Sequence, residues 1–214
     1  ASMYHRGVTI PNSISDQQVV LLDCFEKSGN HDSVVPAEYK GARSAVEYLV
    51  SKGHKKIAHI TDGGNNFASP ERLRAYQDVL NENKIDVNKD FIVKINGSDT
   101  AEGFKATKKI LDLKELPTAI FAYNDRMALG AYEAIQEAGL QVGKDISVIG
   151  FDNQPHFADA LRPGLTTVQL PHYAMGAWAA QRLLDQLQNS ESTNNMRHQI
   201  DCTLVVRDSV GPAR

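Results

Sequence analysis

Short hydrogen-bonding side chains follow four apolar segments of this 214-residue sequence, at the point where each segment ends. The pairs are KIAHIT (56–61) with Asp62, FIVKI (91–95) with Asn96 and Ser98, TAIFAY (118–123) with Asn124, and DISVIGF (145–151) with Asp152. Arg72 lies in the first turn of the helix expected after the first segment. Carboxylates and amides accept or donate in pairs, and a guanidinium is a rigid fork of donors. Together they suit a neutral, polyhydroxylated ligand, with Phe67, Tyr123 or Phe151 against its apolar face.

Each of these polar residues also has a purely structural interpretation. Asn124 and Asp99 could be helix N-caps, and Asp152 could hold a turn. For any one residue alone the structural role is favoured. Because they come from four successive segments, we expect that they are not all structural and that the group forms a ligand site.

The segments that position these residues alternate between short apolar runs and amphipathic stretches. Expected strands are 18–25, 56–61, 91–95, 118–123, 145–151, 166–170 and 199–207; expected helices are 37–53, one opening at Ser69-Pro70, one capped by Asp99, 126–139 and 172–188. This alternation predicts an α/β fold with parallel sheets flanked by helices. Ligands of such folds bind beyond the carboxyl ends of the strands.

Composition excludes several classes of protein. Lysine plus arginine number 23 against 26 acidic residues, a net charge of -3, so the chain lacks the basic excess that gripping DNA phosphates by itself requires. No run of 18 apolar residues predicts a membrane span, and the first residues show no signal peptide. Cys24 and Cys202 form no CxxC motif, which favours a reduced, cytoplasmic location.

Catalytic and metal chemistry have no local support in the sequence. The seven histidines form no HExxH motif and no i,i+4 pair, so we expect neither a metal nor a cofactor. There is no GxSxG elbow, GxGxxG loop or Walker-A loop. A hydrolase using Asp125 and Asp152 would need carboxylates flanking a bond, and a helix start and a ligand acceptor explain the two more simply. We therefore predict no catalytic residues.

Five segments of the chain resemble the effector-binding core of LacI/GalR-type transcriptional regulators, in order and spacing. They are LVSKGHKKIAHI (49–60), ERLRAYQDVL (71–80), AIFAYNDRMALGAYEAIQEAGLQVGKDISVIGFDN (119–153), LRPGLTTVQLPHYAMG (161–176) and LVVRDSV (204–210). The resemblance implies a two-lobed fold like that of periplasmic binding proteins, with three crossovers, near 54–56, 164–167 and 197–199. It implies a partial N-terminal lobe of 1–54 and 166–198, and a C-terminal lobe of 55–165 and 199–214.

The same resemblance assigns roles to individual residues. Arg72 of the RLR motif would clamp the ligand, Asn124 would face it, Asp125 would start the next helix, and Asp152 of GFDN would accept hydroxyl groups. Ser98 would line the pocket wall. The implied ligand is a small sugar-like effector that controls operator DNA binding by a homodimer, through a helix-turn-helix headpiece absent from this sequence. The alternative is a secreted sugar-binding protein for transport.

Overall fold

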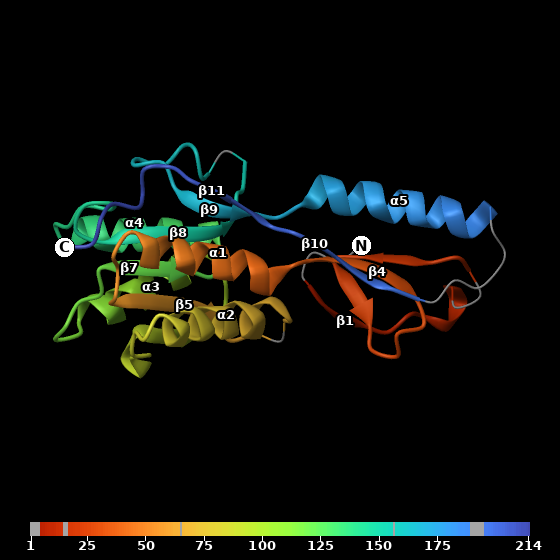
Figure 1. The fold of residues 1–214 in the computed structure, drawn as a ribbon, viewed down its shortest axis with the longest axis horizontal. Helices are drawn as coiled ribbons and strands as arrows, with labels where there is room; N and C mark the ends of the chain where they lie inside the picture. Colours follow the sequence, from red (N-terminus) through yellow and green to blue (C-terminus); the bar gives the residue numbers. More distant parts are fainter. Residues whose placement is uncertain (1–4, 15–16, 65, 156, 189–194) are drawn as a thin grey trace. The chain divides into compact units, whose positions relative to one another are not determined.

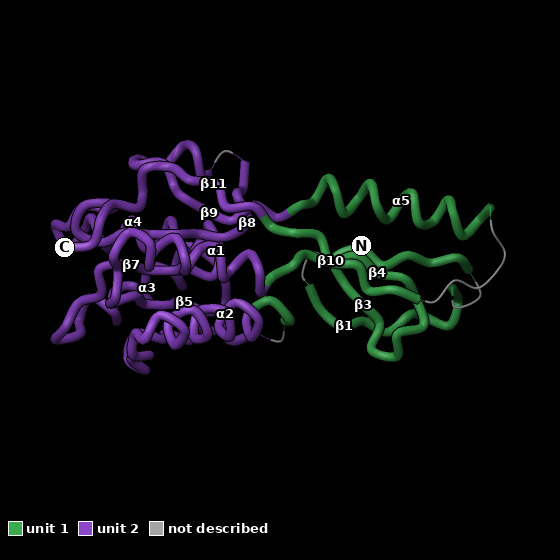
Figure 2. The backbone as a smooth tube through the Cα atoms, viewed as in Figure 1, with its two compact units in different colours: residues 1–38, 65–68, 171–202 green, residues 39–64, 69–170, 203–214 purple. Residues whose placement is uncertain are grey.

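The computed structural model describes residues 5–14, 17–64, 66–155, 157–188 and 195–214, which form two compact units (Figure 2). Unit 1 comprises residues 1–38, 65–68 and 171–202, and unit 2 comprises residues 39–64, 69–170 and 203–214. The chain therefore builds each unit from separated segments. Each unit has its own parallel sheet.

Unit 2 is built on a six-stranded sheet in the order β11-β9-β8-β7-β5-β6 (Figure 1). The strands are β5 (Ile57–Asp62), β6 (Ile92–Ile95), β7 (Ala119–Ala122), β8 (Ser147–Asp152), β9 (Thr166–Gln169) and β11 (Thr203–Val205). Every neighbouring pair is parallel except β11 with β9, which is antiparallel. The predicted α/β class with parallel sheets is confirmed.

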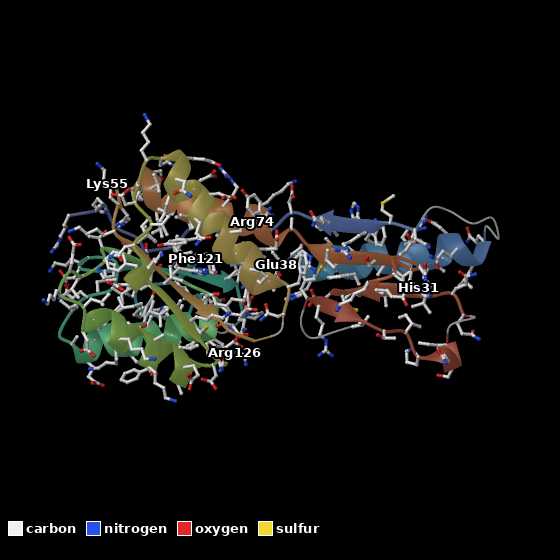
Figure 3. The ribbon with its side chains drawn as sticks, turned by 90° about the horizontal axis from the view of Figure 1, so that it is seen from below. His31, Glu38, Lys55, Arg74, Phe121 and Arg126 are labelled. Carbon is white, nitrogen blue, oxygen red and sulfur yellow. The ribbon has the colours of Figure 1, made fainter. Side chains whose placement is uncertain are left out.

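Helices cover both faces of this sheet. They are α1 (Glu38–Ser51), α2 (Ala68–Glu82), α3 (Thr100–Leu111) and α4 (Asp125–Glu137), with a short 3-10 turn η2 (Lys89–Phe91). Figure 3 shows α1 and α2 on one side of the sheet and α3 and α4 on the other. Strands β5, β7 and β8 are consequently almost wholly buried, which explains their continuous apolar sequences.

An aspartate and an asparagine N-cap fix where α3 and α4 begin. The side chain of Asp99 accepts a hydrogen bond from Glu102 N, 2.9 Å away, and that of Asn124 accepts one from Met127 N at 2.8 Å. Each cap satisfies a backbone N–H that has no partner within its helix. The predicted capping by Asp99 is confirmed.

Helices α3 and α4 pack backbone against backbone through two glycines. A Cβ on Gly130 would overlap the carbonyl oxygen of Thr100, and one on Gly103 would overlap the carbonyl of Met127. A glycine within a helix costs about 1 kcal/mol relative to alanine, so its presence here reflects the close approach. The approach places the N-termini of both helices next to each other, beside the ends of β6 and β7.

The core of unit 2 contains large aromatic side chains. Tyr76, Phe121, Tyr132 and Phe151 are all less than 2 % exposed. Figure 3 places Phe121 among the interior side chains, while Lys55 projects outward. The ring of His59 stacks between Tyr76 and Phe121, with centroids 5.3 and 4.8 Å away.

Unit 1 has a smaller framework. A three-stranded parallel sheet has the order β10-β4-β2, a two-stranded parallel sheet joins β1 to β3, and a 3-10 turn and one long helix complete the unit. The elements are β1 (Arg6–Val8), η1 (Asn12–Ile14), β2 (Val20–Leu22), β3 (Cys24–Glu26), β4 (Asp32–Pro36), α5 (His172–Gln188) and β10 (Arg197–Ile200). Helix α5 packs on β2 and β4 and has Met175 as its only fully buried residue among those described.

A buried carboxylate joins three segments of unit 1. Asp32 is fully buried and accepts hydrogen bonds from Arg182 Nε at 2.6 Å, Gln186 Nε2 at 2.7 Å and Met196 N at 2.7 Å. Burial by itself would raise the pKa of Asp32, but these donors outweigh it and the pKa lies below its usual value. Asp32 thus ties α5 and the start of β10 to β4.

Several expected elements differ from those observed. The strand expected at 18–25 is divided by Asp23, whose φ of 56° breaks the extended backbone into β2 and β3. The strand expected at 199–207 is two strands, β10 in unit 1 and β11 in unit 2. Strand β4 was not predicted, because its sequence DSVVP is short and ends in proline.

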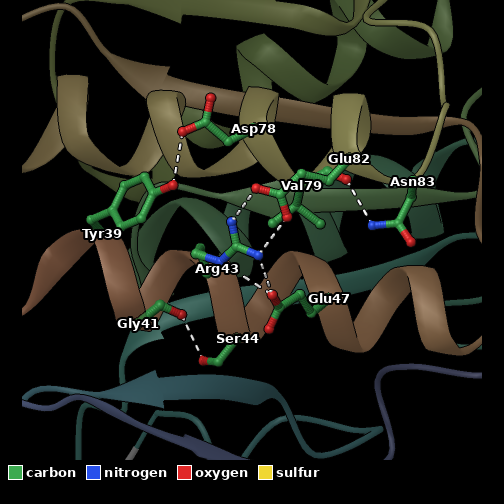
Figure 4. Close-up of polar contacts among 9 residues, drawn as sticks. All are labelled: Tyr39, Gly41, Arg43, Ser44, Glu47, Asp78, Val79, Glu82 and Asn83. Carbon is green, nitrogen blue, oxygen red and sulfur yellow. Dashed lines mark hydrogen bonds and ion pairs between the residues drawn. The ribbon is translucent and has the colours of Figure 1, made fainter.

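The unit boundaries also differ from the expected lobes, chiefly because α1 packs in unit 2. Tyr39 Oη donates to Asp78 Oδ2 at 2.8 Å, and Arg43 holds both oxygens of Glu82 at 2.8 and 2.7 Å (Figure 4). These contacts join α1 to α2. Besides the short stretch 65–68, the chain passes between units after residues 38, 170 and 202, not near 54–56, 164–167 and 197–199.

Candidate ligand-binding site

The sheet order brings the sequence-selected polar residues to one edge of unit 2. Strands β8, β7, β5 and β6 are neighbours and parallel, so their carboxyl ends lie side by side. Asp152 ends β8, Asn124 follows β7, Asp62 ends β5, and Ser98 follows β6. The structure therefore brings together residues that are up to 90 positions apart in the sequence, at the edge where open α/β sheets bind ligands.

Arg72, from the first turns of α2, lies over the aromatic rings of this edge. Its guanidinium carbon is 3.5 Å from the ring centroid of Phe151 and 4.6 Å from that of Tyr123, and Nη1 donates to the carbonyl oxygen of Tyr123. The side chain is buried, with 3 % exposed. Stacking on two rings holds the guanidinium plane, since a cation is attracted to an aromatic face.

Asp152 lies at the end of β8 in a strained backbone. Its φ is 114° and that of Asn153 is 51°, both in the left-handed region that non-glycine residues avoid. Oδ2 of Asp152 accepts from Gln154 Nε2 at 3.1 Å, and the residue is half-buried. The carboxylate follows directly after Phe151, on whose ring Arg72 stacks.

Asn124 has the structural role that the sequence left open. Oδ1 caps α4, and Nδ2 donates to the carbonyl oxygen of Ser98, 2.9 Å away. Ser98 is half-exposed, and contact of Asn124 or Ser98 with a ligand stays a prediction.

Asp125, the first residue of α4 as predicted, lies directly behind this edge. It is fully buried and accepts from Thr167 Oγ1 at 2.5 Å and from Gln154 N at 2.7 Å. Burial raises the pKa of Asp125 to about 7, helped by the charge of Asp152 and opposed by the two hydrogen bonds and the charge of Arg207.

Asn153 links the same turn to β9 and to the segment that follows β11. Its Nδ2 donates to Gln169 Oε1 on β9 at 3.2 Å, and its Oδ1 accepts from Arg207 Nη2, beyond β11, at 2.8 Å. Arg207 Nη1 also donates to the Leu165 carbonyl at 2.7 Å. The turn that carries Asp152 is therefore held by hydrogen bonds to Asp125 and to Arg207.

A buried histidine lies in the same sheet, in the middle of β5. His59 Nδ1 donates to the Phe121 carbonyl at 2.9 Å, and burial lowers the pKa of His59 to about 4, with the nearby charge of Arg72 adding to the effect. The imidazole is therefore neutral at pH 7 and packs as part of the core.

Comparison with known proteins supplies the family. Residues 46–210 match the family of periplasmic binding protein-like domains. A LacI-type transcriptional regulator from Bacillus cereus subsp. cytotoxis has a structure with a TM-score of 0.81 and 30 % identity, over 91 % of this chain and 68 % of that one. The chain belongs to the LacI family. The resemblance stated from the sequence is confirmed, and this relative is a transcriptional regulator rather than an enzyme.

Two further LacI-family relatives define how much of a full regulator the chain represents. The HTH-type transcriptional repressor PurR of Vibrio atlanticus is 35 % identical over 178 residues, 83 % of this chain and 52 % of PurR. A LacI-family regulator from Enterococcus faecium, solved with bound ribose, has a TM-score of 0.79 and 27 % identity, over 91 % of this chain and 71 % of that one. The chain thus spans about half the length of the PurR relative.

Sequence reasoning missed two residues that contact Asp125 behind the edge. Thr167 and Gln154 were not singled out, because a hydroxyl and an amide in a loop carry no distinctive spacing. Gly103 and Gly130 had a readable signal, since a glycine inside an amphipathic helix usually marks a close contact.

The sequence predicted neither a metal-binding cluster nor a membrane-spanning helix. Within the described ranges, no three His, Cys, Asp or Glu side chains gather in a way that could hold a metal ion, and no helix combines the length and apolarity needed to cross a bilayer. Cys24 and Cys202 are buried free thiols. His156 lies outside the described residues.

Proposed function

We propose that this chain is the effector-binding part of a transcriptional regulator and that its effector is a small sugar or sugar derivative. The observation that carries the proposal is Arg72 stacked on Phe151, with the Asp152 carboxylate following in the chain. A sugar ring offers an apolar face to an aromatic side chain and hydroxyl pairs to a carboxylate and a guanidinium. The edge of unit 2 has the carboxylate and the guanidinium, and the Phe151 ring lies buried beneath the guanidinium.

The relatives support this choice of ligand and of regulatory output. The Enterococcus faecium regulator was solved with bound ribose, and the Vibrio atlanticus relative is a helix-turn-helix repressor. By analogy, effector binding would favour one conformation of a homodimer and so change its affinity for operator DNA through a helix-turn-helix headpiece. Such a regulator would act in the cytoplasm.

The description of the matched family supports one alternative. Periplasmic binding protein-like domains include the architecture expected of a secreted sugar-binding protein for transport. The two functions differ in what precedes this sequence in the gene. Codons for a helix-turn-helix support the regulator, and codons for an apolar signal peptide support the transport protein.

Calorimetric titration with D-ribose, D-glucose and adenosine tests the ligand class. We expect a sugar to bind and Asp152→Ala to abolish binding while the circular dichroism spectrum is unchanged. Asp159→Ala is the control, since Asp159 is an exposed carboxylate in the same connection. Binding of adenosine alone would replace the sugar by a nucleoside, and unaltered affinity of Asp152→Ala would remove that residue from the site.

Operator binding by the full-length protein tests the regulatory output. We expect the sugar that binds in calorimetry to change the operator affinity by about 5- to 150-fold, the range typical of allosteric coupling. No change in operator affinity with a bound sugar would favour the transport alternative.

A further inference from the structure

The turn that presents Asp152 is held in a conformation that its own residues disfavour. Two successive non-glycine residues, Asp152 and Asn153, have φ values of 114° and 51°. Such conformations are energetically costly and persist only where neighbouring contacts hold them. The contacts that hold this turn therefore determine where the Asp152 carboxylate lies.

Asp125 makes the central contacts of this kind. One carboxylate oxygen accepts from Gln154 N, two residues beyond Asp152, and the other accepts from the Thr167 hydroxyl. Thr167 Oγ1 in turn accepts from Asn153 N at 3.4 Å. Both backbone N–H groups that follow Asp152 are thus fastened, directly or through one hydroxyl, to the same carboxylate.

The space around this carboxylate is tight. A Cβ on Gly150 would overlap Asp125 Oδ1, so β8 approaches the carboxylate without a side chain between them. The charged and titratable groups facing Asp125 are Asp152 from β8, Arg207 from beyond β11 and Tyr132 from its own helix. Arg207 donates to Asn153 Oδ1 and to the Leu165 carbonyl oxygen.

We propose that Asp125 is a positioning residue: through Gln154 N and Thr167 it fixes the strained turn that places Asp152 at the ligand edge. The expected effect on ligand affinity rests on the proposed function. The hydrogen bonds by which Asp125 holds the turn do not depend on any ligand. Protonation removes one acceptor from the pair of hydrogen bonds. The turn therefore loosens as Asp125 takes up a proton, and its position depends on pH near neutrality, where the pKa of this carboxyl lies.

The first test uses nuclear magnetic resonance and needs no ligand. In a His156→Gln background, which removes the histidine nearest in sequence, the amide resonance of Gln154 is followed from pH 5 to 8.5. We expect it to titrate with a midpoint near 7, and to become flat in Asp125→Asn. Asp145→Asn is the matched control, because Asp145 accepts from Gln141 N at 2.9 Å before the opposite end of β8. A flat Gln154 resonance in the parent chain, or one that still titrates in Asp125→Asn, overturns the inference.

The second test measures binding of D-ribose by calorimetry across the same pH range. We expect Asp125→Ala to weaken binding at least tenfold at pH 8. Asp125→Asn, which like the protonated carboxyl keeps one acceptor oxygen, should bind ribose as the parent does near pH 5 and lose the pH dependence. An Asp125→Asn variant with the parent's pH dependence, or unaltered binding in Asp125→Ala, contradicts the positioning role. If the parent chain binds neither D-ribose nor D-glucose, the proposed ligand class fails, and the amide titration alone decides on Asp125.

Discussion

The two units differ in how completely they bury their own apolar surfaces. In unit 2, six strands lie between two pairs of helices, and Tyr76, Phe121 and Phe151 are less than 2 % exposed. In unit 1, helix α5 exposes Tyr173 by 91 %, Leu184 by 51 % and Leu187 by 62 %. Burial of apolar area is the main stabilising contribution to folding, so we expect unit 2 to be the more stable body.

This difference bears on where the candidate site lies. All four predicted ligand residues, Arg72, Ser98, Asn124 and Asp152, belong to unit 2. A preorganised site needs side chains held by packing and by supporting hydrogen bonds, and unit 2 provides both. The comparison therefore predicts that the geometry around Asp152 survives changes that loosen unit 1.

The largest expected effect comes from emptying the core of unit 2. Phe121→Ala should lower the free energy of unfolding by about 4 kcal/mol, because a large buried ring is replaced by a cavity. Tyr173→Ala on α5 should change it by less than about 0.5 kcal/mol, as is usual for exposed positions. Urea unfolding, monitored in each unit by hydrogen exchange, measures both changes in the free energy of unfolding. A comparable decrease in both variants would contradict the expectation that unit 2 is the more stable body.

Replacing two helix glycines by alanine should give the next largest effects on stability, destabilising at Gly130 and stabilising at Gly176. Gly130→Ala should destabilise by about 3 kcal/mol, because the added methyl group overlaps the backbone of α3. Gly176→Ala on α5 meets no atom within 4 Å and should stabilise by about 0.5–1 kcal/mol through helix propensity. Thermal unfolding of the two variants tests this, and a tolerated Gly130→Ala would show that α3 and α4 can separate.

Two buried aspartates should give the units opposite dependences on pH. The pKa of Asp125 is raised to about 7 from 3.8, so its contribution to the stability of unit 2 is fully present below pH 3.8 and is lost as the pH rises through 7. The pKa of Asp32 is lowered, so its contribution to unit 1 is present above pH 3.8 and is lost as the pH falls through the lowered pKa.

Urea unfolding of Asp125→Asn and Asp32→Asn at several pH values separates the two. Relative to the parent, Asp125→Asn should become more favourable as the pH rises from 4 to 7, and Asp32→Asn should become less destabilising in acid. Parallel slopes for both variants would refute the assignment of one raised and one lowered pKa.

The smallest effect is expected at the exposed contacts between α1 and α2. Arg43→Ala removes the ion pairs with Glu47 and Glu82, which are half or more exposed. Solvent and salt screen such pairs, so the melting temperature should fall slightly at low salt and hardly at all at 1 M salt. A large loss at high salt would mean that Arg43 stabilises unit 2 by packing instead.

Much of unit 2 could be predicted from the sequence, because its signals are local. Continuous apolar runs specify strands buried on both faces, and Asp99 and Asn124 precede their helices with ordinary capping chemistry. The juxtaposition of Asp62, Asn124 and Asp152 then follows from the rule that parallel strands present their carboxyl ends at one edge.

Unit 1 and the supporting contacts could not be predicted in the same way, because they depend on nonlocal geometry. Nothing in QVVLLDCF reveals that Asp23 adopts a φ of 56° and divides the strand. The pairing of β10 with β4 joins residues more than 150 positions apart, and helix periodicity alone does not place α1 with unit 2.

The amide of Asn153 has a mechanical consequence. It grips Gln169, two residues before the chain leaves for unit 1, and Arg207, five residues after the chain returns. A displacement of the turn beside Asp152 therefore also displaces the end of β9 and the segment after β11. The side chain of Asn153 thus couples the turn that carries Asp152 to both segments that connect unit 2 with unit 1.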